Sequence, residues 1–202
     1  MLMISENLRV GLLTDHVAVK DVATTITREL VEKKINTIHK SLVQDFGITQ
    51  ARIAVLGINA HVGDNGVIGD EDDTVVRASL DNLRDNGKII FGPYAADSFF
   101  GTGNYKNFDV IIAAYHDQGL IPFKTLAFGK GVNYTAGLDK VRTSPDHGTA
   151  FDVAGKNVAN EESFRAAIFA AIEIFNSRKQ HDLISENPLK LSNRRPFVKK
   201  RQ

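Results

Sequence analysis

Apolar and polar residues along this chain form two alternating kinds of segment. Short apolar runs bounded by polar turns predict buried strands at 8–14, 52–56 and 108–115. Between these runs, apolar residues recur at helical spacing, which predicts helices. The other expected elements are helices at 20–47, 73–86, 97–100 and 161–176, a strand at 88–91, and extended segments at 125–128 and 132–136. This alternation predicts an α/β layered fold with a largely parallel sheet.

Composition narrows the class of protein. With 202 residues, 43% of them apolar and 24% charged, the chain can bury a sizeable core. The net charge of +1 gives no general attraction to nucleic acid or to acidic membranes. No apolar run approaches the roughly 20 residues that span a bilayer, and the first residues do not form a secretory signal. A cytoplasmic protein with neither nucleic-acid nor membrane partners is the simplest interpretation.

Histidines follow three of the predicted strands. His16, His61 and His116, called the site histidines below, each stand just beyond an apolar run. Ligand sites in open α/β sheets form beyond the carboxyl ends of the strands. A single histidine there is more often a hydrogen-bonded structural residue, but three together favour a divalent-metal site. The chain has no cysteine, so such a site must use histidines and carboxylates.

Polar residues near these histidines offer further chemistry. Asp117, beside His116, could orient the imidazole or act as a base. The glycine-rich acidic segment 61–73 could let the backbone approach a ligand, or simply form turns. Its acidic run 70–73 is expected to cap the helix that follows, and Asn160 is expected to cap the helix at 161–176.

A second polar group follows His116. It comprises Lys124, Asn133 and Arg142. Lysine and arginine suit an anionic substrate, and arginine can hold a carboxylate or phosphate through two hydrogen bonds. Spacing alone also allows ordinary surface residues. The basic, proline-containing tail at 187–202 is interpreted as a solvated segment rather than a nucleic-acid arm.

Six segments together resemble the 4-hydroxythreonine-4-phosphate dehydrogenase (PdxA) family of vitamin B6 biosynthesis. They are LLTDHVAVKDVA, LGINAHVGDNG, GPYAADSFF, AAYHDQGLIPFK, GVNYTAGL and VRTSPDHGTAFDVAG, in order from about Leu8 to about Ile174. The resemblance implies a two-domain fold like that of isocitrate and isopropylmalate dehydrogenases. It also implies a homodimer whose active site lies between domains and near the dimer interface.

The resemblance assigns roles residue by residue. It makes the site histidines the ligands of a divalent metal of the zinc, magnesium or cobalt class, and Lys124, Asn133 and Arg142 the substrate-binding residues. Catalytic roles are expected for Asp117, Lys124 and Asp97. An NAD-binding loop is expected to comprise Asp146, His147, Gly148, Thr149 and Ala150.

The implied reaction is the NAD-dependent oxidation, with decarboxylation, of 4-phosphooxy-L-threonine, a small phosphorylated amino acid. Family members have a substantial region before the first metal histidine, including a His-Thr pair that contacts substrate. Since nothing here matches it, residues 1–202 are interpreted as the C-terminal portion of such an enzyme. Two alternatives stay open. One is a dehydrogenase of another phosphorylated hydroxy acid, such as 4-phosphothreonate or phosphoerythronate, or of a ring diol. The other is a truncated, non-catalytic metal-binding fragment.

Overall fold

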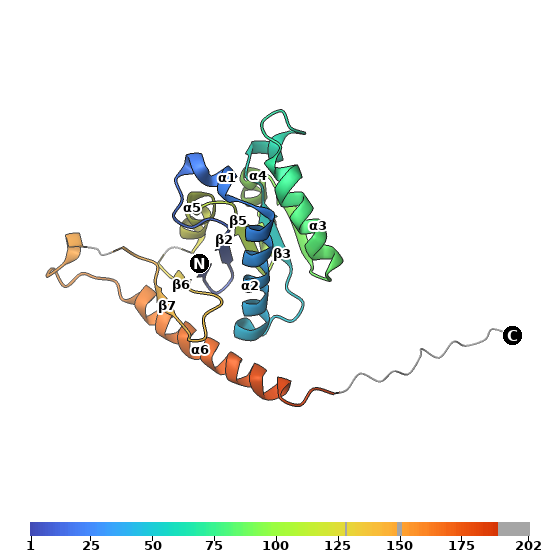
Figure 1. The fold of residues 1–202 in the computed structure, drawn as a ribbon. Coiled ribbons are helices and arrows are strands. Elements are labelled where there is room, and N and C mark those ends of the chain that lie inside the picture. The colour runs from blue at the N-terminus through green and yellow to red at the C-terminus, as the bar shows by residue number, and fades with distance from the viewer. Residues whose placement is uncertain (128, 149–150, 190–202) are drawn as a thin grey trace.

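A seven-stranded mixed sheet forms the centre of the molecule (Figure 1). The computed structural model describes residues 1–127, 129–148 and 151–189. The strands are β1 Leu2–Ile4, β2 Arg9–Leu12, β3 Ile53–Leu56, β4 Ile90–Tyr94, β5 Val110–Ala113, β6 Val132–Tyr134 and β7 Thr143–Pro145. The helices are α1 Val22–Thr25, α2 Arg28–Phe46, α3 Ala78–Asp85, α4 Ala96–Gly101, α5 His116–Leu126 and α6 Glu162–Ser185.

The strand order is β4-β3-β5-β2-β1-β6-β7. Strands β4, β3, β5 and β2 are parallel neighbours, while β1, β6 and β7 each pair antiparallel. Because β1 runs against both β2 and β6, strand β6 points the same way as β2. Five of the seven strands (β4, β3, β5, β2 and β6) therefore share one direction, which confirms the predicted α/β fold with a largely parallel sheet.

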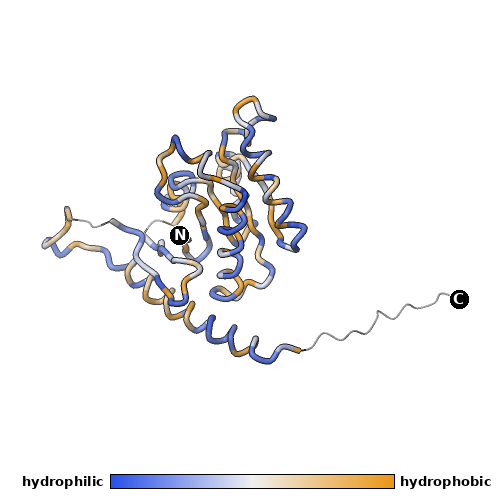
Figure 2. The backbone as a smooth tube through the Cα atoms, in the orientation of Figure 1, coloured by the Kyte–Doolittle hydropathy of each residue, from blue (hydrophilic) through white to orange (hydrophobic). Residues whose placement is uncertain are grey.

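Helices cover both faces of the sheet. Buried residues of α2, α3 and α6 pack on one face, and buried residues of α4 and α5 pack on the other. The central parallel strands β3 and β5 are fully buried, as expected for strands covered on two sides; Ile53, Val55 and Ile112 are 0% exposed, whereas Phe91 of the edge strand β4 is 39% exposed. In Figure 2, α6 is mainly apolar over its first half and mainly polar toward its end. In the part of the chain that the structure describes, no helix is long and apolar enough to cross a membrane.

One sequence prediction of local structure is wrong, and another is met only in part. Residues 125–126 are not extended, because α5 runs from His116 to Leu126. Gly119 and Pro122 lower the helical propensity of this segment, but burial of Leu120 and Phe123 on the sheet outweighs propensity. Asp72 and Asp73 of the acidic run lie in the first turn of the helical segment Asp72–Arg77, but no side chain caps this segment, and Asp72 is completely buried.

Other helices and strands begin or end at residues different from those predicted. Strands β1 and β7 are only three residues long and gave no periodic signal. Helix α6 continues to Ser185, well past the predicted end. Its N-cap position is Glu161, although Asn160 Oδ1 still accepts a hydrogen bond from the Glu162 backbone N–H at 2.8 Å.

Candidate active site

The carboxyl ends of three neighbouring parallel strands carry the site histidines. In the order β3-β5-β2, these strands lead to His61, His116 and His16. The rings of His16 and His116 lie side by side, with 5.9 Å between their centroids and 36° between their planes. The prediction that strand ends would bring histidines together is therefore met for this pair.

Asp117 orients one member of the pair. Its Oδ1 lies 2.7 Å from Nδ1 of His116, at the first turn of α5. An ionised carboxylate can only accept a hydrogen bond, so Nδ1 donates to it, and in a neutral imidazole Nε2 then keeps its lone pair for another partner. This is how carboxylates commonly orient metal-binding histidines. The arrangement fits an imidazole that binds a borderline divalent ion through Nε2.

His61 lies on a loop of unusual backbone geometry. His61, Val62, Asp64 and Asn65 all have positive φ, between 45° and 56°. Such values are costly for residues other than glycine and tend to occur at functional sites. Within the described residues, no group of three or more His, Asp or Glu side chains is placed to hold a metal ion. The structure therefore gathers two of the three predicted ligands and leaves His61 apart.

Buried and acidic side chains hold the base of this loop. Asp72 accepts hydrogen bonds from the backbone N–H groups of Ile58 and Asn59, at 2.7 and 2.9 Å. The Asn59 side chain donates to Glu71 at 2.9 Å. The pKa of Glu71 is lowered, first by a hydrogen bond from its own backbone N–H and then by Asn59. Sequence reasoning missed Asp72, since turn chemistry explains an acidic run equally well.

The segment HDQG, residues 116–119, ends in a glycine that packs closely against the sheet. A Cβ at Gly119 would lie 2.8 Å from Leu12 Cδ2 and 2.9 Å from Val10 Cγ1. Any larger residue would push α5 away from β2, and His116 with it. The glycine therefore brings the start of α5 close to the strand that leads to His16.

Asp97 and Asp117 line one shallow groove between α4 and α5. The groove has a volume of about 490 Å³, and its other lining residues include Tyr115, Gln118 and Ile121. The structure thus places both predicted catalytic aspartates in one groove, which extends along α5 as far as Leu126.

The predicted substrate-binding residues are spread more widely. Lys124 is eight residues after His116 on α5, which is about 12 Å along the helix axis. Its Nζ lies 3.3 Å from both the backbone oxygen and Oδ1 of Asp146. Arg142 donates to Thr135 Oγ1 at 2.9 Å, next to the end of β6. Strand β6 is two strands from β2, about 10 Å across the sheet.

Asn133 is half-buried in β6 and pairs with Met3 of β1. Met3 belongs to the core beneath α5, so Asn133 faces the same side of the sheet as α5. None of these contacts joins Lys124, Asn133 and Arg142 to the histidine pair.

The predicted cofactor loop borders a second cavity. Asp146 and His147 line a space of about 560 Å³ at the start of α6, together with Lys124 and Phe164. The Asp146 backbone N–H donates to Ser163 Oγ at 3.0 Å, and Gly148 follows as an exposed residue. Thr149 and Ala150 lie outside the described residues.

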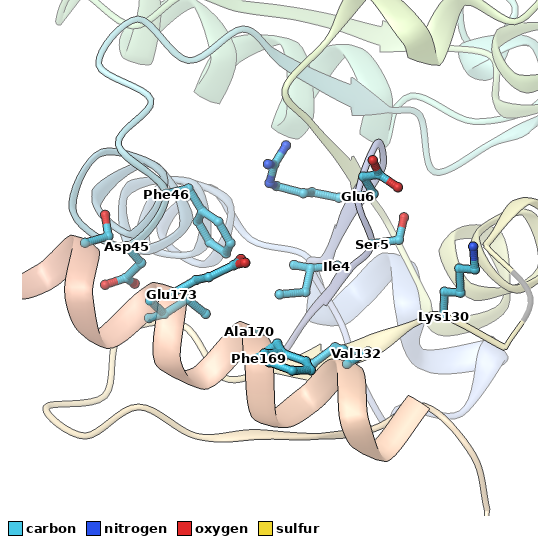
Figure 3. A pocket seen from close by; sticks show the side chains of 14 residues that line it. Ile4, Ser5, Glu6, Asp45, Phe46, Lys130, Val132, Phe169, Ala170 and Glu173 are labelled. Atoms are coloured by element: carbon cyan, nitrogen blue, oxygen red, sulfur yellow. The ribbon is translucent and has the colours of Figure 1, made fainter. Parts of the chain in front are cut away.

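A third cavity, of about 520 Å³, lies near the start of β2, at the opposite edge of the sheet (Figure 3). Figure 3 shows α6 forming one wall with Phe169 and Ala170, while Ile4 and Phe46 face it. Arg9 also lines this cavity, and burial lowers the pKa of its guanidinium. None of the predicted site residues lines it.

A mixed α/β sheet with polar residues gathered beyond its parallel strand ends is a fold class that binds ligands at that edge. Residues 1–171 match the sequence model of the family described as "Pyridoxal phosphate biosynthetic protein PdxA". This chain belongs to the PdxA family.

Two relatives illustrate the match. A protein of Bacteroides thetaiotaomicron named 4-hydroxythreonine-4-phosphate dehydrogenase is 51% identical over 190 residues, covering 94% of this chain and 52% of the relative. One of the same name from Sulfurihydrogenibium is 44% identical over 179 residues, covering 89% of this chain and 55% of the relative. The chain thus spans about half the length of the curated relatives it matches.

Solved structures of PdxA-family and related dehydrogenases resemble the fold of this chain. The 4-hydroxythreonine-4-phosphate dehydrogenase of Klebsiella pneumoniae superimposes with a TM-score of 0.75 at 38% identity, covering 86% of this chain and 53% of that one. A terephthalate 1,2-cis-dihydrodiol dehydrogenase of Burkholderia xenovorans superimposes with a TM-score of 0.68 at 30% identity, covering 84% and 54%.

Proposed function

We propose that this chain carries the histidine-bearing part of an NAD-dependent, divalent-metal-assisted dehydrogenase. Its substrate would be 4-phosphooxy-L-threonine, which it oxidises and decarboxylates in pyridoxal 5'-phosphate biosynthesis. The observation that carries the proposal is the His16–His116 pair at the carboxyl edge of the sheet, with Asp117 bonded to His116. Membership of a family whose relatives bear this enzyme's name supports the choice of substrate.

His16 and His116 are proposed as two ligands of a divalent ion of the zinc, magnesium or cobalt class. His61 would be the third ligand, and its loop, which the structure leaves apart, would have to approach the pair. A bound ion would supply the Lewis acidity that lowers the pKa of a substrate alcohol, and bound NAD⁺ would supply the hydride acceptor. Asp117 keeps Nδ1 of His116 protonated and Nε2 free. Asp97, in the same groove, is our candidate for a proton-transferring group.

Cationic residues would neutralise the substrate's phosphate and carboxylate. Lys124 and Arg142 are proposed for this role, and Asn133 for a neutral hydrogen bond. Lys124 already contacts Asp146 and lies at the far end of α5 from His116. This separation supports a site completed by a second subunit, which is why we propose a homodimer with its active site near the interface.

Two other functions have some support. The likeness to a dihydrodiol dehydrogenase favours a relative with a different substrate, such as 4-phosphothreonate, phosphoerythronate or a ring diol. The other is a metal-binding chain without turnover, because the contacts of Lys124 and Arg142 do not join them to the His16–His116 pair.

The test is NADH formation by the purified chain, after its intact mass has been measured. The substrates 4-phosphooxy-L-threonine, 4-phosphothreonate and phosphoerythronate are compared with zinc, magnesium or cobalt present. NADH from the first substrate alone supports the proposal, and NADH from another substrate supports the related dehydrogenase. Metal binding by calorimetry without NADH formation supports the metal-binding chain without turnover. A His116→Ala variant that binds metal as tightly as the parent would overturn the metal assignment.

A further inference from the structure

The side chain of Gln118 joins the ends of two strands. Its Oε1 accepts a hydrogen bond from the Ala114 backbone N–H, and its Nε2 donates to the Gly57 backbone oxygen, both at 2.7 Å. Ala114 directly follows β5 and is fully buried, while Gly57 directly follows β3. Gln118 thus connects the segment that leads to His116 with the segment that leads to His61.

Thr14 extends this connection to the third strand. Its backbone N–H and its Oγ1 both donate to the Ala114 oxygen, at 3.1 and 2.8 Å. Thr14 is 3% exposed and stands two residues before His16. Both polar groups of the Ala114 peptide are therefore used, one by Gln118 and one by Thr14. A single chain of hydrogen bonds links all three segments that carry the site histidines.

This link lies where regular sheet pairing stops. The recorded pairing of β3 with β5 ends at Val55 and Ile112, and that of β2 with β5 ends at Leu12 and Ala113. The start of α5 has no side-chain cap, so a cap does not fix it. Beyond the paired residues, the Leu13 backbone N–H still donates to the Ala113 oxygen at 2.9 Å. Thr14 Oγ1 adds a side-chain bond between the same two segments, and Gln118 adds the side-chain link from Ala114 to Gly57.

The chemistry at position 118 is specific. One side chain must accept from Ala114 and donate to Gly57, and a primary amide does both. An ionised glutamate keeps the acceptor but has no donor. Methionine has similar length but offers neither group at useful strength.

We propose that Gln118 is a positioning residue that, together with Thr14, sets the spacing of the site histidines. Its effect on metal binding rests on the proposed function, whereas its effect on histidine positions does not. Partners of metal ligands typically change metal affinity by about 10–100-fold when replaced, which sets the expected magnitude.

The experiment compares variants of the full 202-residue chain. Gln118→Met removes both hydrogen bonds, and Gln118→Glu removes the donor to Gly57. Ser163→Ala is the matched control, because Ser163 is 7% exposed and bridges two backbone segments, accepting from Asp146 N–H at 3.0 Å and donating to the Gly131 oxygen at 2.8 Å. Each variant is measured by thermal melting, by NMR of assigned imidazole signals without metal, and by calorimetry with Co²⁺.

Gln118→Met should shift the signals of the site histidines, leave those of His39 and His181 in place, and weaken Co²⁺ binding by about 10–100-fold. Gln118→Glu should shift His61 more than His116, since the bond to Ala114 remains. Ser163→Ala should shift His147 instead and change Co²⁺ affinity less than about twofold, even at equal loss of melting temperature.

Unshifted site-histidine signals in Gln118→Met would overturn the positioning role, whether or not cobalt binds. Equal shifts in Gln118→Met and Ser163→Ala would also overturn it, because general loosening would then explain both. A parent that binds no cobalt, with shifted signals in Gln118→Met, supports the positioning role and refutes the proposed metal site. If Gln118→Met does not fold, Thr14→Val provides the test of the proposal. This variant removes the hydrogen bond from Thr14 Oγ1 to the Ala114 oxygen. An unshifted His16 signal in Thr14→Val would overturn the proposal.

Discussion

Replacing Arg178 with methionine should destabilise the fold by several kcal/mol. Arg178 Nε lies 2.6 Å from Asp45 Oδ1, and the Asp45 side chain is only 1% exposed. Tyr134 also donates its hydroxyl to this carboxylate, and burial together with that bond raises the pKa of Tyr134. Asp45 belongs to α2, Tyr134 to β6 and Arg178 to α6, so the cluster attaches α6 to the rest of the fold.

The expected loss of stability follows from the buried Asp45 carboxylate, which the substitution leaves without its cationic partner. Removing one member of a buried ion pair typically costs about 3–5 kcal/mol, because the other charge stays buried without compensation. Asp45 would keep the Tyr134 hydroxyl, which places the expected loss near the lower limit, at about 3 kcal/mol. In a domain of this size, that corresponds to a fall in melting temperature of about 6–12 °C.

Urea denaturation of the parent and three variants tests this reasoning. The double variant Asp45→Asn/Arg178→Met removes the buried charge together with its partner, and it should regain most of the stability lost in Arg178→Met. Arg165→Met is the control, because Arg165 forms an exposed pair with Glu161 and its loss should cost less than about 1 kcal/mol. A single variant Arg178→Met within about 1 kcal/mol of the parent would refute the uncompensated-charge explanation.

Two further predictions concern packing and pH. Gly119→Ala should cost about 1–3 kcal/mol in urea denaturation, because its Cβ would overlap Leu12 and Val10; an unchanged midpoint would show that α5 shifts freely. Burial, then the charge of Lys88, lowers the pKa of His39 below 6.5. The unfolded chain therefore binds a proton first as pH falls, and stability drops below about pH 6.5. His39→Gln should lessen this drop between about pH 7 and pH 5, and an unaltered pH profile would contradict the assignment.

Much of the fold follows from local pattern. The apolar runs that became β2, β3 and β5 are buried on both faces, so their composition alone identifies them. Helix α2 ends at Phe46 with Gly47 in a left-handed conformation, a standard C-terminal signal. Strands β1 and β7 could not be found in this way, because three residues are too few to show a periodicity, although each pairs with a strand nearby in sequence, β2 and β6. Helix α5 was missed in part because Gly119 and Pro122 weaken a local signal that burial on the sheet overrides.

For the site, the sequence by itself determined which side chains stand at the strand ends. A histidine a few residues after a buried strand lies near the carboxyl edge of the sheet, which made the approach of His16 to His116 predictable, whereas His61 also follows a strand but stays apart. Only the tertiary structure decided the rest. Lys124 contacts Asp146 at the far end of α5, and Gln118 binds the Gly57 oxygen, 61 residues away. Such contacts depend on the relative placement of whole elements, which local propensities do not encode.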